Sequence, residues 1–167
     1  MKKWIVFFLL LIAAAAAGGI YLIGPESFVG KRAQMQTVDL YYYNKEKDTG
    51  AGGQLRCSPA SVLPVERKIP GEKPVRETLE LLLKGELKDE EKAAGFQTEF
   101  PHPDFRLKSV DFDKDSGRLS IYFTRVPGFT SGGSCRTGLL HAQIQKTAGQ
   151  FAGVSQVLIR PETLFQP

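Results

Sequence analysis

The stretch RLKSVDFDKDSGRLSIYFT, residues 106–124, decides how this chain folds. Apolar and polar residues alternate on both sides of a polar turn at 113–117. The apolar positions are Val110, Phe112, Leu119, Ile121 and Phe123. A period of two places these side chains on one face of an extended chain. The alternation and the Asp-Ser-Gly turn therefore predict an antiparallel hairpin.

Helical periodicity flanks this hairpin on both sides. Downstream, residues 136–151 predict a helix with Leu140, Ile144, Ala148 and Phe151 on one face, and residues 154–159 predict a final strand. Upstream, Pro74 suits the first turn of a helix whose apolar stripe is Val75, Leu79, Leu82 and Leu83. Gly85 is expected to end that helix.

Two extended segments precede the first helix. Residues 38–43, VDLYYY, are rich in β-branched and aromatic residues and predict a strand. Leu63, Val65 and Ile69 indicate a second strand, which Pro64 places at a sheet edge. The predicted order is ββαββαβ. Because two amphipathic helices must bury their stripes against a sheet, we expect an α+β two-layer sandwich with one mixed sheet.

A long apolar run precedes this domain. Residues 4–23, WIVFFLLLIAAAAAGGIYLI, contain no charge, and a helix of that length spans about 30 Å, the thickness of a hydrocarbon core. We expect an uncleaved transmembrane anchor over 1–23, a tether over 24–37 and an exported domain over 38–167. Lys2 and Lys3 stay cytoplasmic in this topology. The alternative is a signal peptide cleaved after Ala15–Ala17, which would release the domain as a secreted protein.

The net charge of +4 supports the anchor rather than a nucleic-acid partner. Lys2, Lys3, Lys31 and Arg32 flank the apolar run, and without residues 1–37 the chain has 18 basic and 17 acidic side chains. Nucleic-acid binding requires a clustered basic face, which the sequence does not contain. The expected partners are the lipid bilayer, through residues 4–23, and proteins or wall components of the cell envelope. The oligomeric state stays open.

The two cysteines predict a disulfide. Cys57 and Cys135 are the only thiols, and the predicted domain lies outside the cytoplasm, where disulfides persist. The alternative use of Cys135 is as a nucleophile. The sequence SGGSCR at 131–136 resembles the Ser-His-Gly-Cys-x-Arg signature of peptidoglycan L,D-transpeptidases but lacks its histidine. The bases available elsewhere are His102 and His141, and neither spacing favours activation of a thiol.

No pattern predicts a cofactor or a metal site. Cys57, His102, Cys135 and His141 contain no paired-ligand spacing for zinc. The acidic hairpin turn at 111–117 lacks the glycine and glutamate positions of a calcium loop. We therefore predict a protein that is not an enzyme. Tyr41, Tyr42 and Tyr43 form a possible binding surface for a protein, a small ligand or a wall fragment, although a strand divides them between two faces.

One family shares this arrangement. The segment LELLLKG at 79–85, followed by Glu91, Gly95, Thr98 and Pro101, resembles the centre of the GerMN domain of sporulation and spore germination proteins. The later hairpin, the helix ending at Thr147…Phe151 and the strand 154–159 also fit, so the resemblance covers residues 38–160. Gly85-Glu86 departs from the family's usual Gly-Pro.

The resemblance implies a small α+β module on an exported, membrane-attached protein. Such domains are similar to ring-building motifs of sporulation assemblies and bind or scaffold envelope proteins. We therefore expect an extracytoplasmic binding or assembly module, related to sporulation or germination. The alternative is a cell-wall-processing enzyme that uses Cys135.

Overall fold

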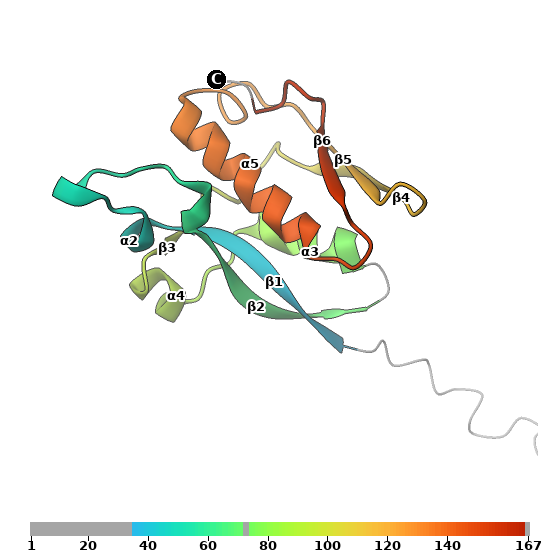
Figure 1. The fold of residues 1–167 in the computed structure, drawn as a ribbon, viewed down its shortest axis with the longest axis horizontal. Coiled ribbons are helices and arrows are strands. Elements are labelled where there is room, and N and C mark those ends of the chain that lie inside the picture. The colour runs from blue at the N-terminus through green and yellow to red at the C-terminus, as the bar shows by residue number, and fades with distance from the viewer. Residues whose placement is uncertain (1–34, 72–73, 166–167) are drawn as a thin grey trace, which may run out of the picture. The chain divides into compact units, whose positions relative to one another are not determined.

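Residues 35–71 and 74–165, which the computed structural model describes, form two three-stranded sheets around two main helices (Figure 1). In chain order the elements are β1 (Met35–Asn44), α2 (Lys45–Asp48), η2 (Ala51–Gly53), η3 (Pro59–Ser61), β2 (Val62–Pro70), α3 (Pro74–Lys84), α4 (Asp89–Ala93), β3 (Phe96–Gln97), β4 (Leu107–Asp113), β5 (Arg118–Phe123), α5 (Ser134–Gly149) and β6 (Gln156–Arg160). The seven predicted elements are present in the predicted order. The short elements α4 and β3 lie between α3 and β4.

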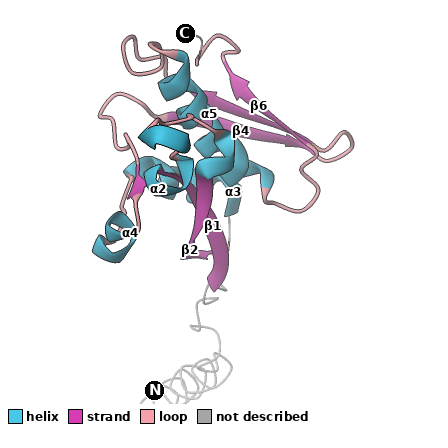
Figure 2. Cartoon of the chain, turned by 60° about the vertical axis from the view of Figure 1, so that its left-hand side comes forward, coloured by secondary structure: helices cyan, strands magenta, loops and turns pink. Residues whose placement is uncertain are grey.

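The strands form two sheets, so the prediction of one mixed sheet is wrong, whereas the α+β class is confirmed. In the first sheet, β1 lies between β2 and β3 and is antiparallel to both. In the second, β5 is antiparallel to β4 and parallel to β6. The two sheets lie on opposite sides of α5, as two views show (Figure 1, Figure 2).

The sheets are separate because α5 fills one edge of β1. The N–H of Asp39 donates to Gln150 Oε1 at 2.8 Å, and Gln150 Nε2 donates back to the Asp39 carbonyl at 2.7 Å. The N–H of Tyr41 donates to Thr147 Oγ1 at 3.0 Å. These side chains make the hydrogen bonds that a neighbouring strand would make. Farther along the same edge, Tyr43 and Asn44 pair with β3, which leaves no place for a strand of the second sheet.

A single main core joins both sheets and both helices. Its buried members include Leu40 and Tyr42 from β1, Leu79 and Leu82 from α3, Leu119, Ile121 and Phe123 from β5, and Leu140 and Ile144 from α5. Gly85 ends α3 as predicted, with a φ of 64°. A side chain there would collide with the carbonyl of Phe100, so both the backbone and the packing require glycine.

The predicted membrane segment lies outside the described residues. Within 35–71 and 74–165, no helix combines the length and apolarity needed to cross a bilayer. The first strand begins at Met35, so residues 35–37 of the predicted tether belong to β1.

We expect Gln150→Ala to lower the free energy of unfolding by about 1–3 kcal/mol, because it leaves the N–H of Asp39 without its acceptor. Urea denaturation of the full chain measures this change. Gln145→Ala is the matched control, since Gln145 is exposed on α5; its effect should stay within about 0.5 kcal/mol. Equal effects of the two substitutions would contradict the role given to Gln150.

Candidate functional site

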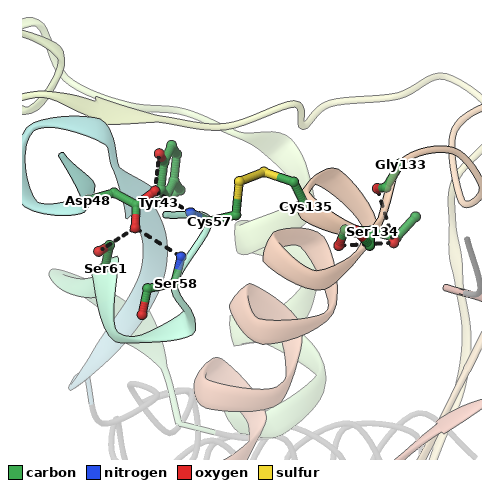
Figure 3. The surroundings of a disulfide bond; sticks show 9 residues. Tyr43, Asp48, Cys57, Ser58, Ser61, Gly133, Ser134 and Cys135 are labelled. Carbon is green, nitrogen blue, oxygen red and sulfur yellow. Dashed lines mark hydrogen bonds between the residues drawn. A yellow bond between two sulfur atoms is a disulfide. The ribbon is translucent and has the colours of Figure 1, made fainter. Parts of the chain in front are cut away.

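A disulfide between Cys57 and Cys135 joins the β1–β2 connection to α5 (Figure 3). The two Cα atoms lie 5.2 Å apart and 78 positions apart in sequence. Cys135 is the second residue of α5, so the bond fixes the amino end of this helix. The structure therefore contains the bond that the cysteine pair predicts.

Beside the disulfide, the buried carboxylate of Asp48 accepts four hydrogen bonds. Its Oδ2 accepts from the Tyr43 hydroxyl at 2.8 Å and from the Cys57 N–H at 2.7 Å. Its Oδ1 accepts from the Ser58 N–H at 2.9 Å and the Ser61 hydroxyl at 3.0 Å. Asp48 is only 1% exposed, and this complete set of donors replaces the water it has lost.

Asp48 and its four donors form what is called here the Asp48 cluster. Its hydrogen bonds determine which form of Asp48 and Tyr43 is present at neutral pH. Burial raises the pKa of Asp48, but the donors from Ser58, Tyr43, Cys57 and Ser61 together hold that pKa below its ordinary value. Burial and the neighbouring carboxylate raise the pKa of Tyr43 to about 12. The carboxylate is therefore charged and the phenol protonated at neutral pH, which is the state that the hydrogen bond requires.

The backbone at Cys57 is unusual. Its φ is 55°, and Cys57 is the only residue other than glycine with a positive φ among the described residues. Left-handed backbone costs a residue with a Cβ about 1–2 kcal/mol, so it persists where other bonds hold it. Here the N–H bond to Asp48 and the bond to Cys135 both hold it. The hydrogen bond from Asp48 and the disulfide therefore both hold Cys57 in this conformation.

A hollow of about 250 Å³ lies beside the amino half of α5. Tyr43, Leu139 and Leu140 supply its apolar lining, and Glu99 and Arg136 lie on its wall. Arg136 Nε donates to Glu99 Oε2 at 2.5 Å. The Nη1 of Arg136 donates to the carbonyls of Gly128, Phe129 and Ser131. The wall is therefore held in place by charge-assisted hydrogen bonds.

The predicted tyrosine surface is mostly buried. Tyr42 is fully buried, and its hydroxyl donates to the Leu82 carbonyl at 3.3 Å. Tyr43 belongs to a second apolar cluster with Val62 and Leu139. Tyr41 is half-buried, with Lys146 Nζ 5.9 Å from its ring centroid. The three residues do not form a shared exposed surface, because Tyr42 and Tyr43 serve the packing.

The three residues considered for catalysis, Cys135, His102 and His141, each make other contacts in the structure. Cys135 forms the disulfide and has no free thiol. His102 packs on the Phe129 ring at 4.4 Å between centroids. His141 lies near Phe165, and burial lowers its pKa. No group of three or more possible metal ligands occurs within the described ranges.

Asp48 and the Glu99–Arg136 pair were not predicted from the sequence. Asp48 lies in a polar, glycine-rich stretch at 44–54 that reads as an exposed loop. A partial signal is the sequence SPAS at 58–61, which suits a short turn capped by Ser58. Nothing local marks Glu99 and Arg136, which are 37 residues apart.

We expect Asp48→Asn to lower the free energy of unfolding by about 1–3 kcal/mol at pH 7, because an amide cannot accept all four donors. The folded-state pKa of Asp48 is depressed, so the carboxylate stabilises the protein above about pH 4 and loses this effect as the pH falls toward the folded value. Urea midpoints at pH 7 and pH 3 should therefore show a smaller difference from wild type at pH 3. Asp115→Asn, at an exposed turn, is the control and should change neither midpoint.

Comparison with known proteins gives one family. The family model "Germane: Sporulation and spore germination" matches residues 39–162. No curated protein and no solved structure gives a significant match. The match includes every described helix and nearly all of the described strands, together with both cysteines and Asp48. This chain therefore belongs to the Germane, or GerMN, family of sporulation and spore germination domains.

Proposed function

We propose that this chain is a membrane-anchored, extracytoplasmic module that binds or assembles envelope proteins during sporulation or germination. The family match supports the biological context. The charge-free run at 4–23 and the flanking Lys2 and Lys3 support the anchor and its orientation. Residues 24–34 then connect the anchor to β1.

The disulfide supports the extracytoplasmic side. Such bonds persist in oxidising compartments and are rare in the cytoplasm. The bond links Cys57, whose N–H donates to Asp48, to Cys135 at the start of α5. It therefore lies within the folded domain and not in a terminal segment. A structural bond in this position suits a domain that lies outside the cytoplasmic membrane.

The observation that best supports a binding role is that Cys135 is bonded to Cys57 in the disulfide. Cys135 is the one nucleophile that the sequence offered for wall-processing chemistry, and a nucleophile requires a free thiolate. In the structure its sulfur is bonded to Cys57, and neither histidine is arranged as its base. A non-catalytic binding role at an exposed surface needs no free thiol, so it is compatible with the disulfide.

We expect the full chain, produced in its native cells, to fractionate with membranes and to be digested by protease added outside the cytoplasmic membrane. Crosslinking of intact cells followed by pull-down should recover an envelope protein or a second copy of the chain in a reproducible complex. A solitary monomer under all crosslinking conditions would argue against the binding role. A protease-protected domain would argue against the topology.

The wall-processing alternative makes a different prediction for the cysteines. If both cysteines serve the bond, Cys57→Ser and Cys135→Ser should lower the free energy of unfolding equally, by about 4 kcal/mol in the chain-entropy model for a loop of this length. Urea denaturation under non-reducing conditions measures both. Loss of a wall-processing activity in Cys135→Ser alone, with the fold intact, would support the enzyme instead.

A further inference from the structure

The outer edge of β2 is the place where the first sheet can be extended. β2 has nine residues and pairs with β1 on one side only (Figure 1). At the other edge of this sheet, β3 has two residues, and side chains of α5 fill the rest of the edge of β1. Backbone groups that lack a partner at a sheet edge are available to another strand.

The hydrogen bonds of Asp39 show which backbone groups of β2 point outward. The N–H and the carbonyl of Asp39 are both bonded to Gln150, on the side away from β2. Asp39 is paired with Glu66, so these two residues share no backbone hydrogen bonds and Glu66 directs its own groups outward. The same alternation directs the N–H and the carbonyl of Lys68 outward.

Two prolines bracket these outward groups. Pro64 and Pro70 occupy the next outward positions on either side, and proline has no N–H. Between them, the outward N–H groups are those of Glu66 and Lys68, and neither makes a hydrogen bond among the described residues. The carbonyl of Glu66 accepts from Arg67 Nη1 at 2.8 Å, and a carbonyl has a second lone pair.

One antiparallel register of two β2 strands pairs both of these residues. In this register a twofold axis passes through Arg67, so Glu66 of each copy faces Lys68 of the other, and each such pair makes two backbone hydrogen bonds. An axis through Glu66 or through Lys68 would instead set a proline opposite the other residue. The prolines therefore select a single register.

The same register makes the charges complementary. Glu66 and Lys68 are exposed on one face of β2, and neither belongs to an ion pair within residues 35–71 and 74–165. Across the axis, each carboxylate faces an ammonium of the second copy, which stabilises the pairing. Charges of one sign, such as Asp111 and Asp113 on β4, would repel a second copy at that edge.

On the opposite face of β2, Arg67 lies at the axis. Its guanidinium binds Glu91 of α4 through two hydrogen bonds of 2.6 and 2.7 Å. Each copy therefore brings a neutralised ion pair to the axis. The two arginines do not repel each other as isolated cations would.

We infer that β2 is a self-association surface, on which a second copy of this chain adds antiparallel about an axis at Arg67. The inference rests on the proposed assembly role and names the partner. The two sheets then form one continuous sheet, in which β3-β1-β2 of one copy is followed by β2-β1-β3 of the other. Because the contact is small, the dimer is weak in solution, and a shared membrane that concentrates the chains favours it.

Charge reversals test this register. Sedimentation equilibrium of the full chain in density-matched detergent micelles measures the dissociation constant of the dimer. Glu66→Lys and Lys68→Glu each set like charges face to face, so each should raise that constant about tenfold or more. The double variant restores opposite charges and should return to within about threefold of wild type. A mixture of the two single variants should form a heterodimer equally well, because each supplies the charge that the other lacks.

Asp115→Lys and Lys114→Glu are the matched controls. They make equivalent charge reversals at the exposed hairpin turn and should leave the dissociation constant unchanged. Amide hydrogen exchange locates the contact. When the protein concentration is raised through the dissociation constant, the amides of Glu66 and Lys68 should slow by about fivefold or more, whereas that of Arg67, which points toward β1, should not change.

Three results would overturn the inference. They are a chain that sediments as a monomer at every concentration, a dimer that the single reversals do not weaken, and single variants that neither the double reversal nor mixing rescues. Failure here is distinguishable from failure of the proposed function. A monomeric chain that still crosslinks to an envelope protein in intact cells would keep the binding role and exclude only the second copy.

Discussion

The hydrogen bonds from Gln150 and Thr147 to the edge of β1 determine the architecture. They give α5 the place that another strand would take, so the chain forms two small sheets instead of one larger sheet. Unpaired backbone groups of Asp39 and Tyr41 would cost free energy in this partly buried position. The side chains of Gln150 and Thr147 supply their hydrogen bonds in place of a neighbouring strand. Because α5 occupies that edge, β3 pairs only with the carboxyl end of β1. It is therefore a short strand at the edge of the sheet.

The same helix is held at its other end by covalent chemistry. Cys135 ties the first turn of α5 to Cys57, and Cys57 is in turn held by the Asp48 carboxylate. α5 is therefore fixed to the β1–β2 unit at both ends, by a disulfide at one and by Gln150 at the other. The hollow beside Tyr43 and Leu139 lies between these two attachments, so its shape is set by parts of the chain that cannot easily move apart.

The elements of this fold were predictable from the sequence, whereas their assembly was not. Period-two and period-3.6 patterns indicate a side chain's face, and they identified both main helices and the hairpin. The sequence also predicted the final strand at 154–159, and Pro64 indicated that the second strand lies at a sheet edge, where β2 is found. The choice between one sheet and two depends on Thr147 and Gln150, whose polar side chains carry no periodic signal. β3 has two residues, too few for any alternation. Asp48 was missed because four donors that converge on one carboxylate come from positions that only the folded loop brings together.

The charge distribution bears on the proposed binding role. Beyond residue 37 the chain is nearly neutral, with 18 basic and 17 acidic side chains, and conspicuous ion pairs such as Arg67–Glu91 and Arg136–Glu99 are satisfied internally. Long-range electrostatic steering is therefore weak. Under the proposed binding role, recognition would then depend on short-range terms, namely backbone hydrogen bonds and apolar burial, which act only on direct contact. If the proposed anchor holds the domain at a membrane surface, that confinement would raise the frequency of such contacts and would compensate for the missing electrostatic attraction. Under the proposed function, the cationic residues around the apolar run and the near-neutral charge of the domain would then serve one mode of binding.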